Sequence, residues 1–194
     1  MAPIPNLEAY PKQIMLLDGT VVSVRPLEPK DQAALLHFFH RVPEEDRFYL
    51  KENVTAPEVI HRWTHEIDFE RVLPLVAVNQ SGEIIADATL HRSRSPARRH
   101  MGELRIVVDP AYREQGLGTR LIRELLDVAT DLGLERAIFE LVAHREEAAI
   151  EAAIRTGFSR VASLKGWVKD IYGNPQELVL LELLLTERRP WWWY

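Results

Sequence analysis

The chain has 194 residues, 46% of them hydrophobic and 27% charged, which suits one globular domain with an ordinary core. Its formal net charge of −5 argues against general binding to nucleic acid or to an anionic membrane. The absence of cysteine excludes disulfides, thiolate nucleophiles and cysteine-based metal sites, and we expect no metal. We find neither a secretory signal nor an apolar stretch long enough to span a bilayer, and therefore expect a cytoplasmic protein.

Helices and strands are predicted from about residue 20 to residue 186. In the first half we expect a strand at 21–24, helices starting at Pro29, Pro43 (through Leu50) and Pro57, and a hairpin of strands 73–78 and 83–90. In the second half we expect a strand at 101–108, a helix at 116–132, a strand at 137–142, a helix at 146–156 and a hairpin of 158–170 and 177–185. Phe38, Phe39 and Trp63 fall at helical spacing and are predicted core residues.

The order of these elements predicts the fold class. The strand–helix–strand unit of residues 101–142 implies locally parallel strands, and the hairpins on either side imply antiparallel pairing. We therefore predict an α/β (α+β) fold with a mixed, mostly antiparallel, twisted sheet of about seven strands and helices on both faces. One domain would span residues 1–194, with a core of about 20–186, a short N-terminal extension and an aromatic C-terminal tail.

The loop before the predicted helix at 116–132 has the character of a phosphate site. A strand ends at Asp109-Pro110, and Gly116 and Gly118 then lead into the helix. Glycine has no side chain, so a ligand can approach the backbone closely. The first amides of a helix have no internal acceptors and lie at the positive end of its dipole. These properties together favour binding of phosphate groups.

Three phosphate-loop patterns compete for this segment. A P-loop requires lysine after its last glycine, and none follows Gly118. A dinucleotide loop requires a third glycine where Leu121 stands, and it expects parallel strands near the N-terminus. The third pattern, Arg/Gln-x-x-Gly-x-Gly/Ala, is matched in full by Arg113, Gly116 and Gly118.

With that third pattern the chain resembles the GNAT superfamily of N-acetyltransferases. The Asp-Pro-x-Tyr-Arg stretch at 109–113, the Gly-Phe pair at 157–158 and the element order carry the resemblance over most of the chain. A looser similarity links the chain to the acetyltransferase domain of bacterial protein-lysine acetyltransferases. It is carried by four short motifs: Asp18-Gly19, Arg25-Pro26-Leu27, Phe38-Phe39 and the Pro-Glu-Glu-Asp-Arg-Phe run at 43–48.

The resemblance implies acetyl-CoA, or another acyl-CoA, as the donor. The edge of the strand at Ile106, Val107 and Val108 would pair with the pantetheine arm as an added strand would. The diphosphate would lie on the loop and the helix start. The residues implied there are Arg113, Glu114, Gln115, Gly116, Leu117, Gly118, Thr119 and Arg120.

The acceptor implied by the resemblance is a primary amine, whose ammonium form must lose a proton before it can attack. Glu103 lies thirteen residues before Gly116, where the lysine acetyltransferases place a glutamate, and is the first candidate for the base. We expect burial to raise its pKa. His144, which follows the strand at 137–142, is a second and weaker candidate.

Three positions depart from the family pattern. Glu146 stands where asparagine is frequent, at the start of the helix before Gly157. Ala153 stands where a tyrosine often protonates the departing thiolate, so the CoA thiolate would leave as the anion or take a proton from water. Glu114 stands where glycine is common, and a carboxylate there repels a diphosphate unless it points outward.

Two classes of function remain open for this loop: an N-acetyltransferase, acting on a small amine or a protein lysine, and a catalytically weak sensor that binds acyl-CoA. A third possibility, nucleic-acid binding through the basic loop at 91–100, conflicts with the acidic composition and lacks aromatic residues for base stacking. The acceptor would be selected by residues 29–69, with Asp46, Arg47 and Tyr49 as candidates, and by the last hairpin. The aromatic tail at 191–194 suggests a homodimer contact or a cover for the chain's own sheet.

Overall fold

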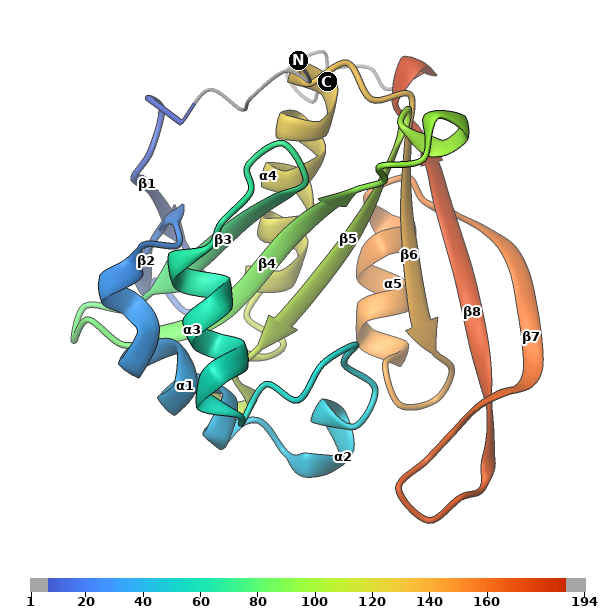
Figure 1. The fold of residues 1–194 in the computed structure, drawn as a ribbon, viewed down its shortest axis with the longest axis horizontal. Helices are drawn as coiled ribbons and strands as arrows, with labels where there is room; N and C mark the ends of the chain where they lie inside the picture. Colours follow the sequence, from blue (N-terminus) through green and yellow to red (C-terminus); the bar gives the residue numbers. More distant parts are fainter. Residues whose placement is uncertain (1–6, 188–194) are drawn as a thin grey trace.

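Eight strands form one sheet in the order β1-β2-β3-β4-β5-β6-β8-β7 (Figure 1). The computed structural model describes residues 7–187, so the tail at 188–194 and its predicted dimer contact lie outside the described residues. The strands are β1 (Lys12–Met15), β2 (Val21–Pro26), β3 (Val72–Val78), β4 (Ile84–Arg92), β5 (Met101–Val108), β6 (Arg136–Val142), β7 (Ser159–Lys169) and β8 (Pro175–Leu184).

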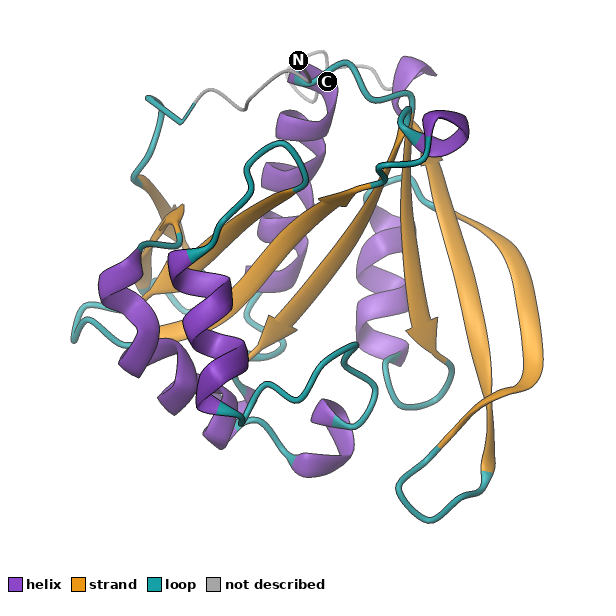
Figure 2. Ribbon diagram, viewed as in Figure 1, coloured by secondary structure: helices purple, strands orange, loops and turns teal. Residues whose placement is uncertain are grey.

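Five α-helices cover the two faces of this sheet in the described part of the chain (Figure 2). One face carries α1 (Gln32–Arg41) and α3 (Pro57–His65), with the short α2 (Glu44–Arg47) beyond them, and the other carries α4 (Leu117–Asp131) and α5 (Glu147–Arg155). The predicted fold class is thereby confirmed. Every strand pair is antiparallel except β5 with β6, which is the crossover predicted around α4.

Several boundaries differ from the prediction by a few residues. β1 was not predicted; it pairs with β2 and makes the sheet begin at Lys12, before the expected core boundary near residue 20. The helix predicted from Pro43 to Leu50 is shorter, because α2 ends at Arg47. β4 continues to Arg92, two residues into the predicted basic loop, since its last residues pair with β5.

Two apolar clusters, one on each face, hold the helices to the sheet. Alternate side chains of a strand point to opposite faces, so the sheet supplies both clusters. Phe38 and Phe39 are fully buried between α1 and the sheet, with ring centroids 4.9 Å apart. The partly buried ring of Trp63 packs edge-on against Phe39 at 6.0 Å between centroids. The prediction of core residues is confirmed for Phe38 and Phe39, whereas Trp63 packs at the edge of the cluster.

Two buried aspartates on the sheet and its connections have opposite environments. Asp31 is 5% exposed and receives two hydrogen bonds from the Arg25 guanidinium, at 2.6 and 2.8 Å. Burial alone would raise its pKa, but the Arg25 contact and the Glu28 amide outweigh this and lower it. Asp87 on β4 is 6% exposed, and within residues 7–187 its carboxylate has no hydrogen-bond or ion-pair partner. Burial raises the pKa of Asp87 to about 7.

These environments predict opposite effects of the same substitution. Asp87 is ionised in the unfolded chain above pH 3.8 but resists ionisation when folded, so its cost to stability grows as the pH rises towards about 7. We expect Asp87→Asn to stabilise the protein by about 1–4 kcal/mol at pH 8 and by less at pH 5, measured by urea unfolding.

Asp31→Asn is the matched control. Because the pKa of Asp31 is lowered on folding, its stabilising contribution is present above the unfolded pKa and is lost only in acid. We expect this substitution to cost about 1–3 kcal/mol at both pH values. A loss of stability at pH 8 on Asp87→Asn would contradict the assigned environment of Asp87.

Candidate active site

The strands β5 and β6 are paired only at their beginnings. Their register runs from Met101 opposite Arg136 to Glu103 opposite Ile138, and beyond this point the strands part, as Figure 1 shows. We call the region where they part the β5–β6 divergence: Leu104–Val108 on β5 and Phe139–Val142 on β6. On their far sides β5 remains paired with β4 and β6 with β8, so along the divergence each of the two strands has an unpaired edge that faces the other.

One hydrogen bond at the end of β5 shows which of its residues turn their backbone N–H and C=O groups towards β4 and which towards β6. The Asp109 amide donates to the Ile85 carbonyl of β4 at 2.9 Å, so Asp109 turns its backbone groups towards β4. Successive residues of a strand alternate, and Ile106 and Val108 therefore turn their backbone groups towards the divergence. The Arg113 guanidinium confirms this at Val108, because its Nε donates to the Val108 carbonyl at 3.2 Å.

The loop that follows β5 presents a row of free amides. Residues Pro110–Tyr112 form a 3-10 turn whose N-cap is Asp109, and α4 begins after Gly116. Among the described residues, no backbone amide from Glu114 to Thr119 has a protein acceptor, and Arg120 is the first to donate back, to the Gly116 carbonyl at 3.1 Å. This is the arrangement of amides predicted for a diphosphate.

The two glycines of the loop serve different purposes. Gly116 adopts φ +81°, in the left-handed region, and a Cβ there would lie 3.4 Å from Leu17 Cγ. Gly118 lies within the helix, and a Cβ on it would meet only Val108 Cγ2, at 4.0 Å. Nothing in the protein's own packing therefore requires glycine at 118. Because Gly118 has no side chain, a ligand can approach the neighbouring backbone amides closely.

Asp46 of α2 joins the two loops that border the divergence. Its carboxylate lies 2.8 Å from Arg113 Nη2, in the loop after β5, and 2.5 Å from Arg145 Nη2, in the loop after β6. Of the three candidates for the acceptor side, Asp46 is thus placed at the mouth of the divergence. Burial raises the pKa of Tyr49, and the charge of Asp170 adds to this effect. Arg47 instead donates to the Val42 carbonyl at 2.9 Å.

Glu103 lies at the point where the divergence begins. It is the last β5 residue paired with β6, and its Cα partner on β4 is His91. Arg105, two residues further along the same face, donates to both Glu103 oxygens at 2.8 and 3.0 Å. The Lys51 ammonium lies 3.6 Å from Glu103 Oε1 and 2.7 Å from Glu140 Oε2 of β6.

The expected pKa shift of Glu103 is wrong in direction. Burial does raise the pKa, as anticipated, but the hydrogen bonds and charge of Arg105, with the charge of Lys51, outweigh it and lower the pKa. The signal was present in the sequence, because Arg105 stands at the same-face position two residues on. Lys51 could not be foreseen, since it lies 52 positions away.

Two histidines differ in their placement. His144, the second candidate base, is exposed and adopts φ +64° in the loop after β6. His91, which the sequence did not single out, is partly buried beside Glu103, and burial together with the Arg105 charge lowers its pKa to about 4. His91 is therefore neutral near pH 7, with Nε2 2.9 Å from the Thr89 hydroxyl.

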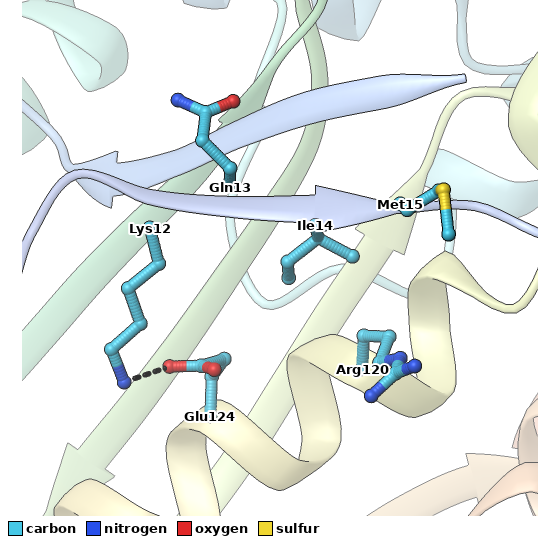
Figure 3. A pocket seen from close by; sticks show the side chains of 6 residues that line it. All are labelled: Lys12, Gln13, Ile14, Met15, Arg120 and Glu124. Atoms are coloured by element: carbon cyan, nitrogen blue, oxygen red, sulfur yellow. Dashed lines mark hydrogen bonds and ion pairs between the residues drawn. The ribbon is translucent and has the colours of Figure 1, made fainter. Parts of the chain in front are cut away.

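Arg120 points away from the divergence. Figure 3 shows it on α4, facing β1 across a groove. In the same groove the Lys12 ammonium of β1 pairs with Glu124 of α4 at 2.6 Å. Arg113 likewise directs its guanidinium to Asp46 and Val108. The diphosphate cradle predicted from the sequence would therefore consist mainly of backbone amides.

The three departures from the family pattern have structural consequences. Glu114 is exposed, and its φ of +61° lies in the region that favours glycine. Ala153 is fully buried in the cluster between α5 and the sheet. Glu146 accepts the Val142 amide at 2.6 Å and so closes the turn between β6 and α5.

Comparison with known proteins identifies the family. Residues 34–158, about two thirds of the chain, match the family described as Acetyltransferase (GNAT) family. The chain belongs to this family. GNAT acetyltransferases use acetyl-CoA as their acyl donor, and the cofactor expected from the sequence is confirmed at this level.

Solved GNAT structures share the fold at low sequence identity. The ribosomal-protein-S5-alanine acetyltransferase from Vibrio fischeri has a TM-score of 0.74 at 17% identity, covering 87% of this chain and 96% of that one. The GNAT domain of S. lividans PAT has a TM-score of 0.71 at 22% identity, with 89% and 96% covered. The yncA protein from Salmonella typhimurium, solved with its cofactor acetyl-CoA, has a TM-score of 0.71 at 20% identity, with 87% and 96% covered.

Among residues 7–187, no helix has both the length and the apolar character that a membrane span requires.

Gly118→Ala tests the cradle in this GNAT protein. The new Cβ meets no protein atom closer than 4.0 Å, so we expect stability to stay constant or to rise by up to about 1 kcal/mol. The methyl group would stand between the amides and a diphosphate. We expect the Kd for CoA, measured by calorimetry, to increase by about tenfold or more.

Gly133→Ala, at the other end of α4, is the matched control. Gly133 has φ +70° and no neighbour within 4 Å of an added Cβ. We expect it to lose about 1 kcal/mol of stability and to keep its affinity for CoA. Equal affinity of the Gly118→Ala variant and the wild type would contradict the assignment of the cradle.

Glu114 offers a second test, which separates charge from backbone strain. Glu114→Gln removes the charge and keeps the strain, whereas Glu114→Gly removes both. We expect both variants to bind CoA several-fold more tightly at low salt and only Glu114→Gly to gain about 1 kcal/mol of stability. Calorimetry at two salt concentrations measures the affinity for CoA, and urea unfolding measures the stability. An unchanged affinity for CoA in both variants would place the diphosphate elsewhere.

Proposed function

We propose that this protein transfers an acetyl group from acetyl-CoA to a primary amine by direct attack, with Glu103 as the group that receives the amine's proton. The observation that carries the proposal is the continuity of the site: the free amides of 114–119 lead to the unpaired β5 edge, and that edge leads to Glu103. A donor bound along this path would have its phosphates at one end and its thioester near the carboxylate.

The chain's own groups fit this donor. The amides from Glu114 to Thr119 would bind the diphosphate, and the backbone of Ile106 and Val108 would pair with the pantetheine amides as an added strand does. When bound, acetyl-CoA supplies an acetyl thioester that an amine can attack. An amide of the β5 edge can donate to the thioester carbonyl, where negative charge develops.

The lowered pKa of Glu103 determines how it would act as a base. The carboxylate stays ionised throughout the neutral range, so it attracts an ammonium group. Because it is a weaker base than an unperturbed glutamate, it would receive the proton transiently and release it to water. His91, neutral and adjacent, adds no positive charge that would repel the acceptor.

The acceptor class follows from the acidic surroundings and from the resemblance. Glu103 and Glu140 both border the divergence on the side of α2, so they suit a cationic primary amine. The similarity to bacterial protein-lysine acetyltransferases, carried by Arg25-Pro26-Leu27 and residues 43–48, favours a protein lysine among such amines. The S. lividans and Vibrio fischeri structures support the fold that this reading requires.

The alternative is a catalytically weak sensor of acyl-CoA. Ala153 removes the phenol that often protonates the thiolate, and this is the feature that favours the sensor. Both readings need the amide cradle, and they differ in turnover. A wild-type protein that binds acetyl-CoA and consumes none across a broad panel of amines and proteins would support the sensor.

Glu103→Gln tests the assigned role. We expect kcat/KM to fall by about 10²–10⁴-fold, because the amide cannot receive the proton, while the Kd for CoA stays unchanged. In the wild type we expect kcat/KM to rise with pH as the amine deprotonates, with no additional limb from Glu103 in the neutral range, since its lowered pKa keeps it ionised there.

Glu151→Gln is the control for this experiment, because Glu151 is an exposed glutamate of α5 paired with Arg155 at 3.4 Å. It should retain full activity. Full activity of the Glu103→Gln variant would remove Glu103 from the mechanism.

A further inference from the structure

The ammonium of Lys51 lies beside Glu103, the carboxylate proposed above as the base. It follows α2 in the chain, and its ammonium bridges two strands, 2.7 Å from Glu140 Oε2 on β6 and 3.6 Å from Glu103 Oε1 on β5. Among the described lysines, it is the one whose ammonium has ion pairs with two carboxylates.

The register of the sheet places this bridge over the divergence. Glu103 is opposite Ile138, the last paired position, and Glu140 lies two residues further along β6 on the same face as Ile138. The Lys51 side chain therefore spans the two strands where they begin to part. Half of the side chain, 49%, remains exposed, so the nitrogen is not locked into the core.

We propose that Lys51 is a self-acetylation site, at which Nζ accepts the acetyl group of acetyl-CoA bound to the same chain. The inference rests on the proposed function, because it uses the same donor path and the same carboxylate. It assigns to that site an acceptor that the chain itself carries.

The step balances without any further reactant. The Lys51 ammonium first gives one proton to Glu103, which passes it to water, and the free amine then attacks the thioester carbonyl. A C–N bond forms and the C–S bond breaks, the second proton of the nitrogen is lost, and the CoA thiolate takes up one proton. The products are Nε-acetyl-lysine at 51, CoA with its thiol and one proton released to water, with no oxidation or reduction.

Lys30 is an internal reference for uncatalysed acetylation. Its ammonium pairs with one carboxylate, Glu28, and its side chain is 72% exposed, more than that of Lys51. Reaction with dissolved acetyl-CoA would favour the more exposed amine. Transfer within the site would reverse that order, because the bound donor and acceptor are held together.

The experiment incubates the full chain with deuterium-labelled acetyl-CoA and quantifies the label on each lysine by proteolysis and mass spectrometry. The deuterium distinguishes this reaction from acetylation that took place in the expression host. We expect Lys51 to be labelled about tenfold or more faster than Lys30, at a rate per molecule independent of protein concentration. Lys51→Arg should carry no label at 51, and Glu103→Gln should slow the labelling of Lys51 towards that of Lys30.

Calorimetry with CoA provides a readout independent of turnover. The Kd of the Lys51→Arg variant should equal that of the wild type, so that loss of label reflects loss of the acceptor and not of donor binding. Labelling of Lys51 no faster than that of Lys30, or at the same rate in urea-unfolded protein, would overturn the inference. So would a rate per molecule that grows with protein concentration.

The proposed transferase activity and the self-acetylation of Lys51 can be contradicted independently of each other. A parallel assay for CoA thiol release with external amines reports the proposed function. Turnover of an external amine without label on Lys51 overturns only the self-acetylation. Absence of CoA binding to the wild type overturns both.

Discussion

The structure depends on one constraint: β5 and β6 are held together over three residue pairs and then forced apart. A parallel pair whose strands separate leaves backbone donors and acceptors without partners on the β5 edge, and such groups are costly when buried away from water. Here β4 satisfies the other edge of β5 completely, whereas β6 is tied to β8 and cannot follow. The edge is therefore available to an extended ligand that carries amides of its own.

The connection after β5 extends the same principle. Instead of satisfying its amides internally, the chain turns through Asp109-Pro110 and starts α4 with a left-handed glycine. The result is a run of polar backbone that leads from a helix N-terminus to a strand edge. Stability of the rest of the domain comes from the two apolar clusters, so the site can remain open without weakening the fold.

Charged side chains position the acceptor side relative to this backbone path. Asp46 links α2 to the loops that follow β5 and β6, and Lys51 links the α2–α3 connection to the strands themselves. These contacts are partly exposed, so each contributes little to global stability, but together they fix where α2 lies. The segment proposed to face the acceptor is thereby held by the same loops that border the proposed donor path.

The local parts of this site could be predicted from the sequence, and the long-range parts could not. The glycines at 116 and 118 and the strand before them follow from spacing and periodicity, and Glu103 follows from the resemblance to the lysine acetyltransferases. Arg105 can also be identified in the sequence as the same-face neighbour of Glu103. Its hydrogen bonds and positive charge are the main reason that the pKa of Glu103 is lowered and not raised. By contrast, no local pattern connects Asp46 with Arg145 or Lys51 with Glu140, because these pairs form only when the sheet and α2 are assembled. The strand β1 escaped prediction for a related reason: four residues with one buried side chain carry too little periodicity.

Amide chemical shifts on titration with acetyl-CoA test the central claim most directly. In a ¹H–¹⁵N spectrum, the account predicts that the largest changes fall on the amides from Glu114 to Thr119 and on those of Ile106 and Val108, with small changes in β1. Changes centred on the groove of Lys12 to Met15 and Arg120, with the amides of residues 114–119 unaffected, would contradict it.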